Sequence, residues 1–272
     1  MQNYKQIAQE TLEIIEANNY VVKDKLVRLS NKPQYLREVI VYDFDSVVAS
    51  VRTLKENIRI SIGEIKVDTF DSLTSAKVNG VGRVLVLNFA NAYHPGGGFL
   101  RGAIAQEEAI CRCSSLYVSI SSEKAAEMYA YNKAHISPEG SDYMLLSPNV
   151  CVFRDCNCNL ISNPYNVSVI TAAAPNLYDE AYKLNEPQLG EIMRHKIRNV
   201  ITVAAQNAYD TLILGAWGCG AFGHNARDMA GYFYDVLVGE NYRRYFDRIV
   251  FSIYAKDEYD YNYKEFAKSF KV

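Results

Sequence analysis

The sequence lacks the features that mark membrane insertion, secretion or a broad nucleic-acid surface. No uninterrupted apolar run approaches the length needed to cross a bilayer. The polar, amphipathic start has neither the basic n-region nor the apolar h-region of a signal peptide. The net charge of −2 over 272 residues shows no basic excess of the kind that coats nucleic acid. These absences predict a cytoplasmic protein with no membrane partner.

The six cysteines form no even framework, and we expect them to be reduced thiols. Cys156 and Cys158 have no matching second pair, whereas structural zinc needs four well-spaced ligands. No carboxylate or histidine cluster has metal-ligand spacing either. We therefore expect neither a metal nor a cofactor.

Strand and helix patterns alternate along most of the chain and predict an α/β fold. A hydrophobic fraction of 49% and a charged fraction of 22% are those of an ordinary globular protein. Residues 1–57 have helical periodicity and no chemical motif, so we interpret them as an N-terminal helical extension. Residues 58–272 then form the main domain, with ligand expected at the carboxyl ends of its strands. We expect strands at 58–67, 84–89, 149–153, 167–171, 211–215 and 248–254, and helices at 106–121, 187–208, 226–238 and from 258 to the end.

A glycine triplet follows the strand expected at 84–89. Gly96, Gly97 and Gly98 leave a stretch of backbone with no Cβ to obstruct a ligand and with free access to positive φ. Gln106, Glu107 and Glu108 come next, and at least one of the two adjacent carboxylates could give or take a proton. Together they suggest glycosidic chemistry on a nucleotide-like substrate. The alternative is that the glutamates only stabilise the first turn of a helix through its dipole.

A second glycine-rich loop spans 215–223, between an apolar strand and an expected helix. Its four glycines, with the positive end of a helix behind them, favour an anion-binding nest. Neither a Walker A loop nor a dinucleotide fingerprint fits the spacing. Two such loops, each at a strand end, indicate a pyrophosphate between them.

These motifs resemble the signature of poly(ADP-ribose) glycohydrolases of the compact bacterial and fungal type. The resemblance rests on the glycine triplet, the Gln-Glu-Glu sequence seven residues after it, and the segments 86–91, 152–155, 168–176 and 215–223. It runs in the same order from about residue 60 to 255. It implies a macrodomain-like three-layer sandwich, with a mixed, mainly parallel sheet and added N-terminal helices.

The resemblance also implies roles for the two glutamates. Glu108 would protonate the leaving hydroxyl of a ribose–ribose O-glycosidic bond and then activate water, while Glu107 would bind the ribose. Neighbouring helix residues point about 100° apart, so we expect one of the two to transfer the proton. Two close carboxylates should raise the pKa of one of them.

Further site residues follow from the same resemblance. Asn91 would hydrogen-bond the ribose, and Phe222 would pack against the distal ribose. Asp68 would meet the adenine amino group, although Asp68 or Thr69 could instead cap a helix. The remaining substrate-binding set is Gly96, Gly97, Gly98 and Gln106 around the sugar and phosphate, with Gly218, Cys219, Gly220 and Ala221 around the diphosphate. We interpret His94 and His224 as loop residues and Trp217 as a core residue.

Three functions remain open at this point. The protein could release ADP-ribose from polymer, bind ADP-ribose as a reader module without cleaving it, or remove mono-ADP-ribose from protein or nucleic acid. The intact Gln106-Glu107-Glu108 sequence favours the first, because many macrodomains that only bind ADP-ribose lack this carboxylate pair. The partner is then an ADP-ribose polymer or an ADP-ribosylated macromolecule, and we expect a monomer.

Overall fold

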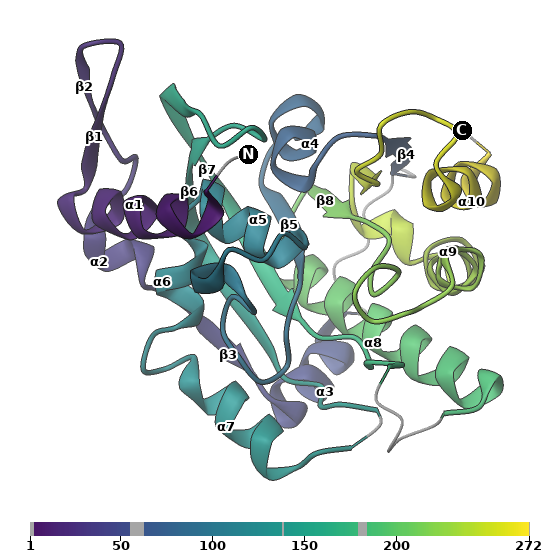
Figure 1. The fold of residues 1–272 in the computed structure, drawn as a ribbon. Helices are drawn as coiled ribbons and strands as arrows, with labels where there is room; N and C mark the ends of the chain where they lie inside the picture. The colour runs from purple at the N-terminus through teal and green to yellow at the C-terminus, as the bar shows by residue number, and fades with distance from the viewer. Residues whose placement is uncertain (1–2, 55–62, 138, 179–183, 272) are drawn as a thin grey trace.

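A seven-stranded sheet organises the protein. The computed structural model describes residues 3–54, 63–137, 139–178 and 184–271 (Figure 1). Within these residues the strands of the sheet lie in the order β3-β6-β7-β5-β8-β9-β4. Their bounds are Ile40–Tyr42 (β3), Glu64–Asp68 (β4), Val84–Phe89 (β5), Met144–Arg154 (β6), Leu160–Ala172 (β7), Thr211–Leu214 (β8) and Arg248–Ser252 (β9). Strands β7, β5, β8, β9 and β4 run parallel, while β6 and β3 pair antiparallel. The mixed, mainly parallel sheet is confirmed.

Helices cover both faces of this sheet. Leu85 and Leu87 of β5 pack into one apolar cluster, and Val86 between them packs into another. The period of two explains why the central strands are continuously apolar, since both of their faces are buried. The first cluster takes in α3 (Phe44–Thr53), α8 (Glu186–Gln206), α9 (Ala226–Tyr234) and α10 (Tyr261–Phe270). The second takes in α1 (Tyr4–Ala17), α4 (Ser72–Asn79), α5 (Gln106–Cys113), α6 (Leu116–Ile120) and α7 (Ala126–Ala134).

The N-terminal segment contains strands as well as helices. After α1 the chain forms a hairpin of β1 (Asn19–Val22) and β2 (Lys25–Arg28), which projects from the body of the molecule (Figure 1). Its two turn residues, Lys23 and Asp24, have positive φ, as a tight hairpin turn requires. The short helix α2 (Pro33–Leu36) follows, and β3 then joins the edge of the main sheet. The described N-terminal residues thus contribute to the sheet, and the division at residue 57 stays a prediction.

Several predicted elements differ from the observed ones at their ends. The helix expected over 106–121 is two helices, because Ser114 is extended and forms a β-bridge with Val152. Strands β6 and β7 are much longer than expected and pair with each other over most of their length. Part of the strand expected at 58–67 lies outside the described residues, and β4 begins at Glu64.

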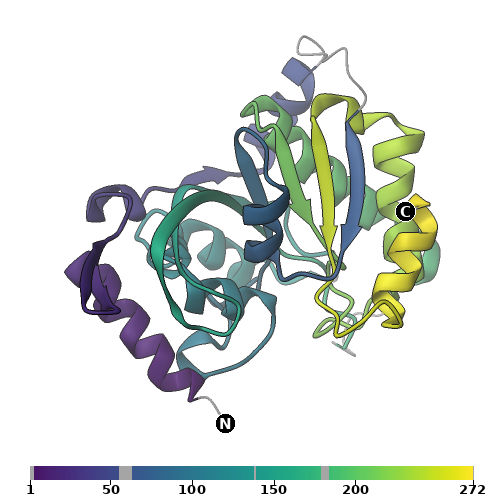
Figure 2. The same cartoon turned by 90° about the horizontal axis from the view of Figure 1, so that it is seen from above.

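Figure 2 shows α1 and α10 at opposite sides of the molecule. No helix in the described part of the chain is long and apolar enough to cross a membrane.

Candidate active site

The first turn of α5 carries both glutamates, and it buries them. Glu107 is 3% exposed and Glu108 is 8% exposed. A carboxylate placed only to meet a helix dipole would remain in water, because burying a charge is costly. Their burial next to the glycine triplet favours the chemical interpretation of the pair.

Glu107 is held at both carboxylate oxygens. Its Oε1 accepts from Nδ2 of Asn88 at 3.1 Å, and its Oε2 accepts from the backbone N–H of Asn91 at 2.8 Å. Burial raises the pKa of Glu107 to about 8, against the lowering effect of these hydrogen bonds. The neighbouring Glu108 adds to the rise by a smaller amount. One raised pKa was predicted for the pair, but its main cause is burial rather than the second carboxylate.

Glu108 is held at one oxygen and free at the other. The backbone N–H of Gly98 donates to its Oε1 at 2.8 Å. Its Oε2 is buried and meets no hydrogen-bond partner among the described residues. Gly97 lies between the two carboxylates: it has φ of +56°, and a Cβ there would lie 2.6 Å from Oε1 of Glu108. The bare backbone is therefore required by the glutamates themselves as well as by any ligand.

Gln106 fixes α5 to the sheet. Its Oε1 accepts from the N–H of Phe89 at 2.9 Å, and its Nε2 donates to the carbonyl of Leu87 at 2.7 Å and to Oγ of Ser72 at 3.1 Å. These three bonds engage its whole amide. These contacts position α5 at the end of β5, and the binding of substrate by Gln106 stays a prediction.

The second glycine-rich loop follows β8 and turns around His224. Gly218 has φ of +77°, and a Cβ there would lie 2.5 Å from the His224 ring. His224 is buried, its Nε2 bonds to the carbonyl of Pro175 at 2.8 Å, and burial lowers its pKa. The ring thus joins two loops at the carboxyl edge of the sheet, a structural role beyond that of an ordinary loop residue. Trp217 is 1% exposed and belongs to the core, as predicted.

The tip of this loop is open. Gly220 and Ala221 are exposed, Phe222 is half-buried, and no described heavy atom lies within 4 Å of a Cβ placed on Gly220. Beside them Cys219 is largely covered, and burial raises its pKa to about 12, so that it remains a neutral thiol. An open, uncharged turn of backbone is suited to an anion.

A cavity of about 90 Å³ brings the two loops together. Asn91 from the first loop and Phe222 from the second both line it. Sequence reasoning did not select its other polar lining residues, which are Tyr93, Asn132, His135, Ser137, Ser141, Tyr143 and Asn176. Tyr93 follows Asn91 in the first loop, and Asn176 lies in one of the segments that carry the family resemblance. The others come from α7 and the connection after it, where no motif marks them.

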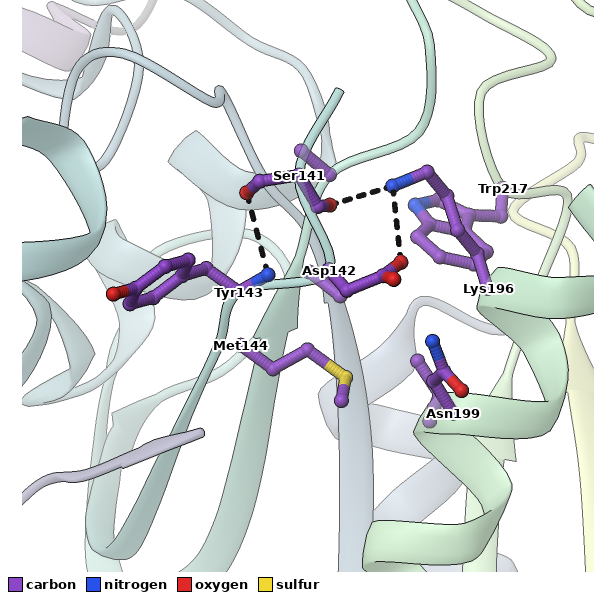
Figure 3. Close-up of a pocket in the computed structure, with 10 residues that line it drawn as sticks. Ser141, Asp142, Tyr143, Met144, Lys196, Asn199 and Trp217 are labelled. Carbon is purple, nitrogen blue, oxygen red and sulfur yellow. Dashed lines mark hydrogen bonds and ion pairs between the residues drawn. The ribbon is translucent and has the colours of Figure 1, made fainter. Parts of the chain in front are cut away.

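Polar contacts beside this cavity continue into a neighbouring pocket, which Figure 3 shows with Ser141, Asp142 and Lys196 among its lining residues. Lys196 of α8 donates to the carbonyl of Ser141 at 2.6 Å and lies 3.9 Å from Asp142. The hydroxyl of Ser141 donates to Oδ1 of Asn132, whose Nδ2 donates to the carbonyl of Ala92 at 2.8 Å. A chain of polar contacts thus runs from α8 to the loop that follows β5.

Asp68 is engaged with its own segment. Its Oδ1 accepts from the N–H of Phe70 at 3.1 Å, and its Oδ2 accepts from Ser75 Oγ and Asn79 Nδ2, each at 2.7 Å. The expectation that Asp68 or Thr69 caps a helix is wrong. Asp71 caps α4 instead, because its carboxylate accepts from the two backbone N–H groups of the first turn. The contact of Asp68 with adenine stays a prediction.

The comparisons with known proteins agree with this geometry. A family model described as microbial-type PARG, catalytic domain, matches residues 8–155. The chain belongs to this family. No curated protein sequence matches it significantly.

Solved structures of poly(ADP-ribose) glycohydrolases match nearly the whole chain. The enzyme from Thermomonospora curvata is 31% identical, with 98% of each chain covered and a TM-score of 0.90. The same enzyme bound to the inhibitor ADP-HPD is matched at a TM-score of 0.84, with 30% identity over 97% of this chain and 98% of the other. The enzyme from Deinococcus radiodurans in complex with ADP-ribose is 29% identical over 90% of this chain and 98% of its own, with a TM-score of 0.82.

Proposed function

We propose that Glu108 is the general acid and base with which this poly(ADP-ribose) glycohydrolase cleaves the ribose–ribose O-glycosidic bond. The observation that carries the proposal is its carboxylate, held at Oε1 by Gly98 while the buried Oε2 has no partner among the described residues. A group that transfers a proton must be fixed in place and still have an oxygen that no other protein group engages. Glu107, bound at both oxygens, does not meet the second requirement.

The reaction then proceeds by acid catalysis followed by base catalysis. Glu108 protonates the oxygen of the departing ribose as the glycosidic bond breaks, through an oxocarbenium-like transition state. The resulting carboxylate takes a proton from water, which attacks the anomeric carbon and releases ADP-ribose. Glu107 is protonated at neutral pH through burial, which avoids a second negative charge beside Glu108 and suits it to bind a ribose hydroxyl.

The remaining predicted residues form the binding surface. Asn91 and Phe222 face one cavity and are suited to hold the two riboses. The loop of Gly218, Cys219, Gly220 and Ala221, with its exposed tip at Gly220 and Ala221, and the triplet Gly96, Gly97 and Gly98 are suited to the diphosphate. The Deinococcus radiodurans relative has been solved in complex with ADP-ribose, which supports ADP-ribose as the ligand class.

The N-terminal segment braces the catalytic helix. Thr11 of α1 donates to the carbonyl of Arg112 at 2.9 Å, and the Arg112 guanidinium lies over the Tyr4 ring at 4.5 Å from its centre. Because α5 carries both glutamates, we assign residues 1–57 a stabilising role as an extension of the catalytic domain.

Parallel assays of the Glu108→Gln variant and the wild type test the proposal. With poly(ADP-ribosyl)ated protein as substrate, we expect release of ADP-ribose to fall by about 10² to 10⁴-fold, the usual contribution of a general acid. Binding of ADP-ribose, measured by calorimetry, should change little because the amide keeps the shape of the carboxylate. Glu123→Gln, at an exposed position on the surface, serves as the control.

The outcomes separate the alternatives. Equal turnover by Glu108→Gln and the wild type contradicts the assigned role. Release from mono-ADP-ribosylated protein but not from polymer points to the mono-ADP-ribose reaction. Tight ADP-ribose binding by the wild type, with no release from either substrate, points to a reader.

A further inference from the structure

A second cavity lies along α5 from Gln106 to Cys113, and three cysteines line it. Its volume is about 350 Å³, and Cys113, Cys156 and Cys158 all line it. Ile104 and Tyr254, which also line it, are 73% and 78% exposed, so its mouth opens to solvent. Gln106 borders it, but neither catalytic glutamate does.

Cys113 and Cys158 meet at one carbonyl beside this cavity, that of Asp155. Cys113 is the last residue of α5, and its thiol donates to this carbonyl at 3.3 Å. A turn holds Cys158 in place: its N–H donates to the carbonyl of Asp155 at 2.9 Å, and its φ is +61°. The Asp155 carboxylate caps the same turn by accepting from the N–H of Asn159 at 2.8 Å. This unusual backbone conformation is fixed by several contacts, and it brings Cys158 to the carbonyl that the Cys113 thiol meets.

Two buried arginines surround Cys158. Arg112 and Arg154 are 4% and 6% exposed. The Arg112 charge acts on the Cys158 thiol, and Nη1 of Arg154 donates to the Cys158 carbonyl at 2.8 Å. Arg154 also pairs with Glu10 of α1 at 3.2 Å, which holds its guanidinium in position.

These neighbours make the two thiols unequal. The neighbouring Cys113 thiol and the arginine charges lower the pKa of Cys158 to about 6, against the effect of burial. The neighbouring Cys158, together with burial, raises the pKa of Cys113. Cys158 is therefore the more acidic and more reactive of the two thiols, and Cys113 keeps its proton. Cys156, two residues away and exposed, has a raised pKa through partial burial and nearby carboxylates.

We propose that Cys158 and Cys113 form an oxidant-reactive dithiol, in which Cys158 attacks hydrogen peroxide and Cys113 then closes a disulfide. In the first step the Cys158 sulfur attacks one peroxide oxygen, the O–O bond breaks, and the departing hydroxide takes up a proton to become water. In the second, the Cys113 sulfur attacks the Cys158 sulfenic acid, the S–O bond breaks, and the hydroxide leaves as water with the Cys113 proton. Two thiols are oxidised to one disulfide and one peroxide is reduced to two waters. The new bond ties the end of α5 to the turn after β6.

Mass spectrometry of the full chain tests the proposal without an activity assay. After treatment with one equivalent of hydrogen peroxide and alkylation of the remaining thiols, we expect a cross-linked peptide joining Cys113 to Cys158. The number of titratable thiols in the denatured protein should fall by two from the six of the sequence. Cys156→Ser should still form the disulfide. Cys113→Ser should stop at a Cys158 sulfenic acid that dimedone traps, and Cys158→Ser should keep all of its remaining thiols.

A pH profile provides an independent readout. Alkylation of Cys158 by iodoacetamide should vary little between pH 7 and pH 9, whereas that of Cys156 should rise by roughly tenfold per pH unit. Disulfides that join other cysteines, or a Cys158 profile that parallels that of Cys156, would overturn the proposal.

Discussion

The backbone N–H of Gly98 donates a 2.8 Å hydrogen bond to Oε1 of Glu108, ten residues later in the chain. The glycine loop and α5 therefore fix each other. Gly97 stands at the closest point between them, where any side chain would meet the carboxylates. The geometry of the acid pair thus depends on a residue that takes no part in the chemistry.

Gly97→Ala should lower both stability and activity. Its φ of +56° is unfavourable for a residue with a Cβ, and that Cβ would lie 2.6 Å from Oε1 of Glu108 and 3.2 Å from Oε2 of Glu107. We expect a loss of about 1–3 kcal/mol in the free energy of unfolding, measured by urea titration. Polymer hydrolysis should fall as well, because the carboxylates must move. Gly231→Ala in α9, where an added Cβ meets no described atom within 4 Å, is the control and should leave both quantities at or above the wild-type level. A Gly97→Ala protein as stable and as active as wild type would contradict the argument.

Glu107 should make the protein less stable as pH rises. Its folded-state pKa is about 8 against an ordinary value of 4.5, so the folded protein holds this proton more tightly than the unfolded chain does. The stabilisation is complete below pH 4.5 and is lost as pH rises toward 8, with a slope of up to about 1.4 kcal/mol per pH unit. Glu107→Gln removes this titratable carboxyl group, so the free energy of unfolding of the variant should fall less steeply between pH 4.5 and 8 than that of the wild type. Parallel curves for the two proteins would show that Glu107 is ionised in the folded state.

The sequence was most informative where one chain segment carries the whole pattern. The continuously apolar strand β5 and the adjacent glycine and glutamate motifs predicted the sheet edge and the acid pair, because each depends on residues close together in the chain. The pattern did not show that Gln106 would engage the backbone of β5, or that Asp71 rather than Asp68 would cap α4. These outcomes depend on which donors and acceptors the fold brings within 3 Å.

Long-range polar contacts were beyond the reach of the sequence. Asn132 reaches Ala92 from forty residues away, and Lys196 reaches Ser141 from fifty-five. The hairpin of β1 and β2 was missed for another reason. Each of its strands has four residues, too few for alternation to stand out from a helical pattern.

Asn132→Ala should weaken substrate binding more than it slows chemistry. The change leaves the carbonyl of Ala92 without the donor that now lies at 2.8 Å, next to Asn91 and its contact with Glu107. We expect KM for polymer to rise by about tenfold, equivalent to the one or so kcal/mol of a lost hydrogen bond, with a smaller change in kcat. Steady-state kinetics gives both values. Asn149→Ala, which removes a surface amide that donates to Glu38, should leave them unchanged. A fall in kcat at constant KM would instead place Asn132 in the chemical step.

Gly220→Ala tests whether the second loop holds the diphosphate. Its φ lies outside the left-handed region and a Cβ there meets no described atom within 4 Å, so the folded protein should accept alanine with an unchanged melting temperature. A diphosphate close to the backbone would meet that methyl group, and we expect the Kd for ADP-ribose, measured by calorimetry, to rise by about tenfold or more. Gly239→Ala is the control, since it is equally free of contacts but lies beyond α9, outside the loop. Equal affinity for ADP-ribose in the two variants would show that the diphosphate does not lie against Gly220, whatever the effect of Glu108→Gln on turnover. The two results therefore separate where the substrate binds from how it is cut.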